Sequence, residues 1–206
     1  MNTVHSIHPH IPCNMNYQIF NDPFPHVIIE NTFDENQLRL IWREIEFLGD
    51  KLEGPENYST KQEDGTYLTT AGALQLDNVY TERCFSDILR ITQKVFFDNE
   101  QLFKDLLEAN EYWKTYCRSN QDVTKIRRYY PGEEYKPHED CQIHVIISTT
   151  FGEDAGGNLY FPKQKCLIET TNNKTVIFPG WIQHSVTKVF EEDRYAITKF
   201  VRCNWD

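Results

Sequence analysis

The chain has 206 residues, which is the size of one domain or of one domain with appended helices. With 39% hydrophobic residues it can form a core of its own, because a chain of this size buries roughly 70% of its unfolded surface. The formal net charge of −10 argues against wholesale binding to nucleic acid or to an anionic membrane, since both require a cationic surface.

Two further absences narrow the class of protein. No apolar run approaches the ~20 residues that span a bilayer, and residues 1–16 lack the positive start and apolar stretch of a secretory signal. The six cysteines are scattered without a C-x-x-C pair, so they read as reduced thiols. We therefore expect a cytoplasmic protein without membrane contact.

The first part of the chain alternates between irregular and periodic segments. Residues 1–16 read as a loose arm, and the alternating segment 23–31 predicts a strand. The capping box Thr32-x-x-Glu35 and the helical spacing of apolar residues behind it predict a helix over residues 34–49.

The segment 51–68 is rich in glycine, proline, asparagine and charge and has no apolar period. It predicts a long loop, which is either an inert connection or a lid over a binding site. Two more helical patterns follow over residues 82–97 and 100–117.

From residue 122 onward the chain changes character, because short β-branched and aromatic runs alternate with Pro, Gly, Asn and Asp turn signals. Many short strands with close turns predict a sandwich or barrel. We expect one domain over residues 1–206, in which residues 17–120 form a helical support and residues 121–206 form the β core.

The sharpest local feature is the run Tyr135-Lys136-Pro137-His138-Glu139-Asp140. In an extended segment His138 and Asp140 share a face, so both can reach one metal ion. A third ligand has to come from a distant strand, and His184 in FPGWIQHSV is well placed for it. Two histidines and one carboxylate on one face of an octahedron are the ligand set of non-haem Fe(II) oxygenases, although such a set also accepts Mn, Co, Ni or Zn.

Several motifs in a fixed order carry a family resemblance. They are Tyr129-Tyr130-Pro131-Gly132, the Tyr135-x-x-His138-x-Asp140 run, Gly156-Gly157-x-Leu159-x-Phe161, Phe178-Pro179 before His184, and Arg194-Tyr195-Ala196-Ile197. Together they resemble the prolyl 4-hydroxylase-like branch of the 2-oxoglutarate/Fe(II) oxygenases, closely over residues 120–202. The opening PFPHVIIENTFDENQLRLIWREI looks like the usual first strand and helix of that branch.

The resemblance implies an α+β fold in which a double-stranded β-helix, a jelly-roll or cupin-like core, carries N-terminal helices on one sheet. It implies Fe(II) held by His138, Asp140 and His184, with 2-oxoglutarate and O2 as cosubstrates and room for ascorbate as an accessory reductant. It also implies that Arg194, ten residues after His184, holds the far carboxylate of 2-oxoglutarate. Arg194, Ala196, Thr198 and Phe200 share one face of a strand, and a guanidinium on the inner face of a barrel requires an anionic partner.

Some positions depart from the family pattern. A tyrosine on the strand after the His-x-Asp motif often contacts the cosubstrate, whereas the stretch here is Ile147-Ser148-Thr149, so we expect Thr149 or Tyr129 to take that role. Six residues after Arg194, where prolyl hydroxylases commonly place a tryptophan, the chain has Phe200. Phe200 and Tyr135 are the candidate substrate contacts.

Alternative roles stay open for several residues. His144 is a rival metal ligand, and Arg194 can instead pair with Glu191, Glu192 or Asp193 on the surface. His5, His8 and His10 are better explained as part of the arm than as a metal site, and Cys141 as a packed thiol. The basic run KIRRYY at residues 125–130 predicts a solvated edge strand.

The sequence thus predicts a 2-oxoglutarate- and Fe(II)-dependent dioxygenase that hydroxylates a C–H bond, with a prolyl residue of a protein or peptide as the leading substrate. The same chemistry on a small molecule, a free amino acid or nucleic acid is one alternative. A non-catalytic metal-binding barrel that acts as a sensor is another. The oligomeric state is left between monomer and homodimer.

Overall fold

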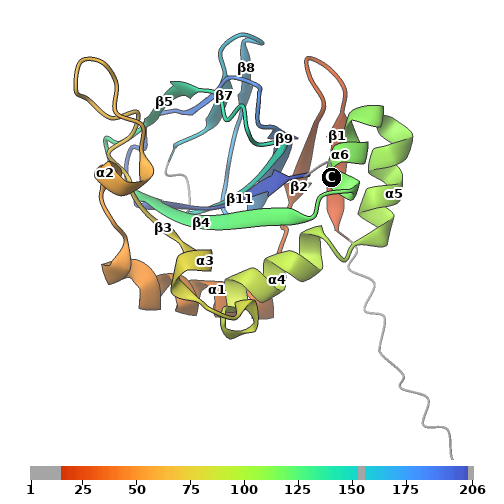
Figure 1. Ribbon diagram of the computed structural model, residues 1–206, viewed down its shortest axis with the longest axis horizontal. Coiled ribbons are helices and arrows are strands. Elements are labelled where there is room, and N and C mark those ends of the chain that lie inside the picture. Colours follow the sequence, from red (N-terminus) through yellow and green to blue (C-terminus); the bar gives the residue numbers. More distant parts are fainter. Residues whose placement is uncertain (1–14, 153–155, 204–206) are drawn as a thin grey trace, which may run out of the picture.

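The computed structural model describes residues 15–152 and 156–203. Two antiparallel β-sheets face each other in it, and helices cover the outer side of the larger sheet (Figure 1). The predicted arm lies almost entirely outside the described residues.

The larger sheet has seven strands in the order β1-β2-β9-β6-β11-β4-β3, and the smaller has four in the order β5-β10-β7-β8. The strands of the larger sheet are β1 (Asn16–Phe20), β2 (His26–Glu30), β3 (Gly72–Gln75), β4 (Gln121–Tyr129), β6 (Val145–Phe151), β9 (Lys174–Pro179) and β11 (Arg194–Arg202). Those of the smaller are β5 (Tyr135–His138), β7 (Leu159–Phe161), β8 (Cys166–Ile168) and β10 (His184–Val186). This double-stranded β-helix with helices on one sheet confirms the predicted fold class.

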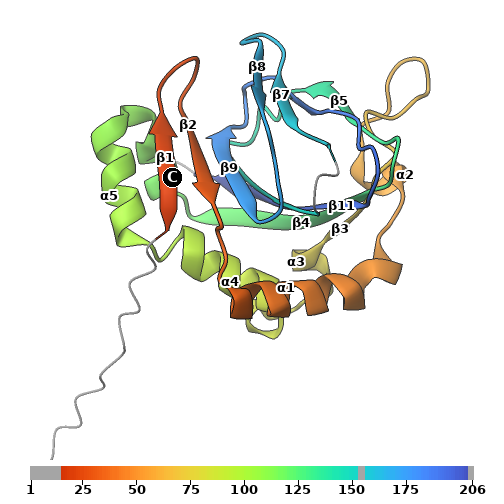
Figure 2. The same cartoon turned by 180° about the vertical axis from the view of Figure 1, so that it is seen from behind.

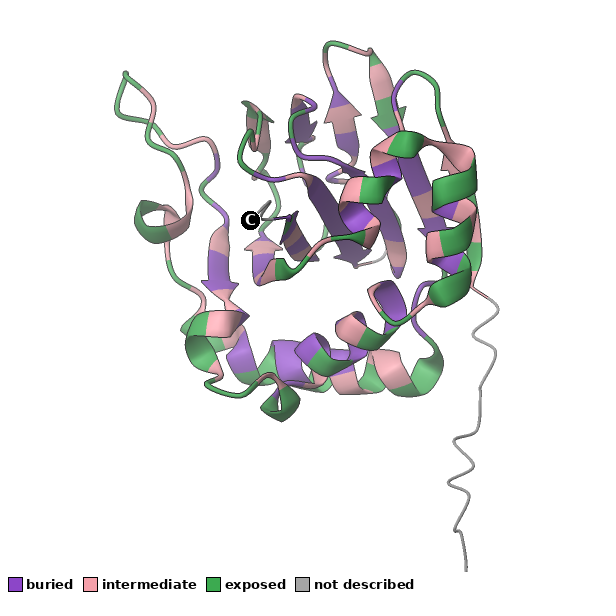
Figure 3. Cartoon of the chain, turned by 45° about the vertical axis from the view of Figure 1, so that its right-hand side comes forward, coloured by how far each residue is buried: buried purple, intermediate pink, exposed green. Residues whose placement is uncertain are grey.

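The helices are α1 (Glu35–Leu48), α2 (Pro55–Tyr58), α3 (Leu76–Val79), α4 (Asp87–Phe96), α5 (Glu100–Ala109) and α6 (Lys114–Cys117). Short 3-10 turns occupy Gly49–Lys51, Arg83–Phe85 and Glu111–Trp113. The buried stripes of α1 and α4 face the large sheet and their exposed sides face outward (Figure 3). The helix predicted over residues 100–117 is interrupted at Asn110, whose side chain accepts a hydrogen bond from the Tyr112 amide and so starts a new turn.

The start of α1 differs from the sequence prediction. The capping box is formed by Asp34 and Gln37, each of which binds the backbone N–H of the other, at 2.9 and 3.0 Å. Thr32 is buried instead, and its hydroxyl pairs with that of Thr175 at 2.8 Å. Because the Thr32 hydroxyl is bonded to Thr175, it is not available to cap the helix, and the cap lies two residues later than predicted, at Asp34.

Strands β1 and β3 were not predicted, because they lie in the part of the chain expected to be helical support. They form the two edges of the large sheet, where β1 pairs with β2 and β3 pairs with β4 (Figure 2). Strand β4 consequently lies between β11 and β3, so the prediction that KIRRYY forms a solvated edge is wrong.

The two faces of the large sheet belong to two separate hydrophobic clusters. Ile147, Phe151 and Val201 belong to the cluster that includes the buried side chains of the helices. Ile146 and Ala196 belong to the cluster between the two sheets. Strand alternation produces this division, since neighbouring residues point to opposite faces. The cavity described below lies on the inner side.

Candidate active site

Strands β5 and β10 are paired so that His138 lies directly opposite His184. The ring centroids of the two histidines are 4.3 Å apart. Asp140, two residues beyond His138, places Oδ2 at 4.0 Å from His138 Nε2 and 3.7 Å from His184 Nε2. One ligand atom from each of the three residues lies within 4.8 Å of the others, so the three residues that the sequence singled out meet at one point.

Both histidines are held in the same way by the backbone. The Nδ1 atom of His138 lies 2.9 Å from the carbonyl oxygen of Lys136, and Nδ1 of His184 lies 2.9 Å from that of Ile182. A carbonyl oxygen only accepts, so each Nδ1 donates its proton. Each Nε2 consequently keeps its lone pair and faces Asp140, which is the tautomer needed to bind a metal ion.

Burial sets the charge state of these groups. It lowers the pKa of His184 to about 3 and lowers the pKa of His138, while it raises the pKa of Asp140. The imidazoles are therefore neutral, and the nearby cations Lys125 and Arg127 only partly offset the loss of hydration of the Asp140 carboxylate. Two neutral imidazoles and one carboxylate fit a divalent cation with open coordination positions.

Arg194 lies in the same cavity, at the start of β11. Its side chain is 1% exposed, Nη2 donates to Thr150 Oγ1 at 2.9 Å, and the guanidinium lies 5.2 Å from the centre of the Tyr129 ring. Among the described residues Nε and Nη1 have no hydrogen-bond partner, and burial lowers the pKa of this group. A surface ion pair is excluded because Arg194 is buried and, among the described residues, pairs with none of Glu191, Glu192 and Asp193, the last of which pairs with Arg128. A buried guanidinium with two free donors fits the carboxylate of a bound ligand.

The backbone beside Arg194 is glycine for a steric reason. Gly157 has φ +68°, and a Cβ atom there would lie 2.3 Å from Arg194 Cδ. Any larger residue would push the arginine stem out of place, which explains the second glycine of the Gly156-Gly157 motif.

Thr149 is placed wrongly by the sequence prediction. Its side chain points to the helical face of the sheet, where its hydroxyl pairs with Thr175 at 2.6 Å. The neighbouring positions face inward, since Ser148 lines the cavity and Thr150 binds Arg194. Because side chains alternate along β6, the hydroxyl groups that face the cavity are those of Ser148 and Thr150, the two neighbours of Thr149.

The other predicted residues lie where expected. Tyr129, Tyr135, Ala196, Thr198 and Phe200 all line the cavity. The Tyr135 ring stacks on His138 at 4.0 Å between centroids and so fixes one wall of the site.

Three other early interpretations have different outcomes. His144 lies outside the ligand cluster, and its Nδ1 accepts the backbone N–H of Cys203 at 3.2 Å. Cys141 is exposed rather than packed, because it lies in a turn after the strand has ended. His5, His8 and His10 lie outside the described residues.

The sequence reasoning missed Lys125, Arg127 and Tyr58, which also line the cavity. Arg127 donates to the backbone oxygens of Ala71 at 3.1 Å and Tyr58 at 3.2 Å, so it fastens the segment before β3 to the barrel. The signal was present, since Lys125 and Arg127 share strand parity with Tyr129.

Comparison with known proteins agrees with this geometry. Residues 124–202 match the model of the 2OG-Fe(II) oxygenase superfamily. No curated protein matches the chain in sequence. Among the described residues, no helix has the length and apolar character to cross a membrane.

Several solved structures share the fold. A Trichoplax adhaerens prolyl hydroxylase in complex with a hypoxia inducible factor peptide fragment has a TM-score of 0.61 at 15% identity, covering 86% of this chain and 83% of that one. A Pseudomonas putida prolyl-4-hydroxylase has a TM-score of 0.57 at 14% identity, covering 87% and 93%. A Burkholderia pseudomallei oxidoreductase of the 2OG-Fe(II) oxygenase family has a TM-score of 0.56 at 12% identity, covering 86% and 84%.

Residues 124–202 thus resemble the 2OG-Fe(II) oxygenase superfamily in sequence, and the chain shares the fold of solved prolyl hydroxylases. The convergence of His138, Asp140 and His184 beside a buried arginine fits the cofactor of that superfamily, Fe(II), and its cosubstrates 2-oxoglutarate and O2.

Proposed function

We propose that the protein is a dioxygenase that hydroxylates a C–H bond of a prolyl residue in a protein or peptide. The observation that carries the proposal is the cavity that His138, Asp140 and His184 share with Arg194. A metal site alone would also suit a sensor, whereas a buried guanidinium with two free donors serves a second, anionic ligand.

Each residue has a distinct task in this proposal. His138, Asp140 and His184 hold Fe(II), and the carbonyl groups of Lys136 and Ile182 keep both imidazoles in the binding tautomer. Arg194 binds the far carboxylate of 2-oxoglutarate. When bound, Fe(II) couples the oxidative decarboxylation of 2-oxoglutarate to the oxidation of the substrate.

The cavity wall supports an apolar ring as the oxidised group. Tyr135, Phe178 and Phe200 contribute aromatic surface next to the ligand cluster, and Ile146 and Val186 add aliphatic surface. These groups exclude water from the reacting bond. The fold shared with two prolyl hydroxylases, one of them in complex with a peptide fragment, supports proline in particular.

The test is incubation of the protein with Fe(II), 2-oxoglutarate and a panel of proline-containing peptides, with mass spectrometry for the gain of one oxygen atom. We expect oxygen gain on a prolyl residue together with an equal amount of succinate. Oxygen gain on a free amino acid but on no peptide would overturn the substrate assignment. Absence of succinate formation that depends on both iron and 2-oxoglutarate would favour a non-catalytic barrel.

A further inference from the structure

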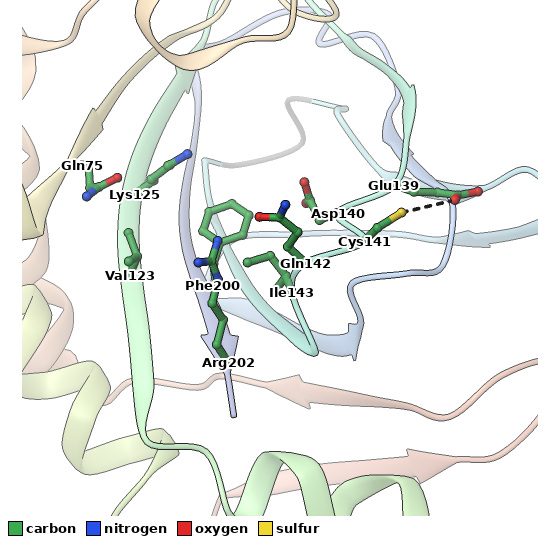
Figure 4. Close-up of a pocket in the computed structure, with 10 residues that line it drawn as sticks. All are labelled: Gln75, Val123, Lys125, Glu139, Asp140, Cys141, Gln142, Ile143, Phe200 and Arg202. Carbon is green, nitrogen blue, oxygen red and sulfur yellow. Dashed lines mark hydrogen bonds between the residues drawn. The ribbon is translucent and has the colours of Figure 1, made fainter. Parts of the chain in front are cut away.

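A second cleft of about 360 Å³ opens beside the metal-ligand cluster. Its walls come from the ends of β3 and β4, from the turn after Asp140, and from the end of β11 (Figure 4). Lys125, Asp140 and Phe200 line both this cleft and the cavity of the candidate active site. A ligand in the cleft would therefore lie next to the group that is oxidised.

The cleft is less acidic than the chain as a whole, because its two cations match its two carboxylates in number. The chain carries a net charge of −10, yet Lys125 and Arg202 both face the cleft. Of its two carboxylates, Glu139 pairs with Lys163 at 2.6 Å, and Asp140 faces the two histidines with which it would hold the metal ion. Over the part of the chain that the structure describes, neither Lys125 nor Arg202 has an ion-pair partner.

Lys125 is the better placed of the two cations. Its ammonium group lies 5.0 Å from the centre of the Phe200 ring and 5.7 Å from that of Tyr58, so its stem is packed between two aromatic side chains. Partial burial, followed by repulsion from Arg127, lowers the pKa of Lys125, and the nearby Asp140 only partly offsets these effects. A further anion beside the ammonium group would offset them more fully.

The neighbouring cation cannot take this role. Arg127 already donates to the backbone at Ala71 and Tyr58. Lys125 has three donors and no hydrogen-bonded partner among the described residues, so it remains available to a ligand.

We propose that the cleft binds the substrate peptide next to its oxidised residue, and that Lys125 pairs there with an acidic side chain of that peptide. This inference rests on the proposed function and specifies the substrate as an acidic peptide. The carboxamide of Gln142 stands on the opposite side of the cleft, where it can pair with a peptide group (Figure 4). A nucleic acid fits less well, because its binding relies on several phosphate contacts, and this cleft offers two free cations in a strongly acidic chain.

The experiment measures binding rather than turnover. The full chain is loaded with Fe(II) and 2-oxoglutarate without oxygen, and fluorescence anisotropy follows the binding of labelled five-residue peptides. The peptides have a central proline. For each flanking position there are three mixtures, with glutamate, glutamine or lysine at that position and varied residues at the others. A labelled single-stranded oligonucleotide serves as a fourth probe, and calorimetry on the same preparation measures the binding of 2-oxoglutarate.

At one flanking position we expect the glutamate mixture to bind about tenfold more tightly than the glutamine mixture, the effect of about 1.4 kcal/mol from one charged contact. Lys125→Gln should abolish this ratio, and Lys125→Glu should shift the preference to the lysine mixture. Arg202→Gln, at an exposed position, should lower the ratio only in part. Lys114→Gln is the matched control, because its ammonium pairs with Glu111 away from the cleft, and it should keep the full ratio.

Equal binding of the three mixtures by the wild type, or a glutamate preference that survives Lys125→Gln, would overturn the inference. Tighter binding of the oligonucleotide would replace the peptide with nucleic acid. Failure of the proposed function looks different, since the iron-loaded protein would then either not bind 2-oxoglutarate or add no oxygen to the bound peptide once O2 is admitted, even if the glutamate preference were present.

Discussion

Replacing Arg194 with methionine separates its role in ligand binding from any role in folding. The guanidinium is 1% exposed, and its Nε and Nη1 atoms have no partner among the described residues. Methionine keeps most of the stem, which packs against Gly157, but removes the charge and all donors.

The expected effect on 2-oxoglutarate binding is large. Two charge-assisted hydrogen bonds at ~1.5–3 kcal/mol each amount to about 3–6 kcal/mol, which corresponds to a loss of affinity of about 10²- to 10⁴-fold. The free energy of unfolding without ligand should not fall, because the substitution removes a buried charge that is paired with no carboxylate of the described residues. One residue would thus be required for binding and dispensable for folding.

The assay combines two measurements. Calorimetry without oxygen gives the affinity of the Fe(II)-loaded protein for 2-oxoglutarate, and urea unfolding gives the stability of the ligand-free protein. Arg128→Met is the matched control, because Arg128 pairs with Asp193 at a partly exposed site and should change either quantity by at most about 1 kcal/mol. An unchanged affinity in Arg194→Met would refute its role as the cosubstrate partner, and a marked loss of stability would show that the arginine serves the fold.

Three further substitutions test other parts of the structure. Asp140→Ala should abolish iron binding and succinate formation, because it removes one of three ligands; retention of stoichiometric iron by atomic absorption would contradict this. Thr149→Val should leave the affinity for 2-oxoglutarate unchanged and lower the free energy of unfolding by about 1 kcal/mol, since only its hydrogen bond to Thr175 is lost; weaker cosubstrate binding in calorimetry would argue against the assigned orientation. Asp122→Asn should destabilise the protein by about 3–5 kcal/mol near neutral pH, because it leaves the buried Lys199 ammonium unpaired. Burial raises the pKa of Asp122, but the ion pairs with Arg83 and Lys199 outweigh this effect and hold the pKa below its ordinary value of 3.8. The stabilisation by Asp122 is therefore present above pH 3.8 and is lost on further acidification. Urea unfolding as a function of pH should show a smaller difference between wild type and variant below pH 3.8, and a constant difference would contradict the ion-pair explanation.

The metal-ligand cluster could be predicted from sequence because strand geometry makes its spacing informative. His138 and Asp140 share a face at the end of one strand, and His184 begins another. The same alternation explains the inward position of Arg194, Ala196 and Phe200, which the structure confirms.

The alternation of side chains along a strand predicts which residues share a face, but not which of the two faces points into the cavity. The sequence alone does not determine which of the hydroxyl residues on β6 faces inward. Thr149 was predicted there as an alternative to Tyr129, whereas Ser148 and Thr150 lie on the cavity side. The position of β4 depends on its partner β3, which is only four residues long and lies in the part of the chain expected to be helical support. Long-range pairing of this kind leaves little local signal in the sequence.

The two-faced large sheet has a practical consequence for anyone who measures variants of this protein. On β6, Ile147 and Phe151 belong to the hydrophobic cluster of the helical layer, whereas Ile146 and Ser148, on the opposite face of the strand, line the cavity of the candidate active site. Substitution of the first pair should reduce the yield of folded molecules and leave the turnover of each surviving molecule intact, and substitution of the second pair should do the reverse. The activity of a crude lysate depends on both the amount of folded protein and the turnover of each molecule. Only rates normalised to the amount of folded protein can therefore assign a defect to the correct side of the strand.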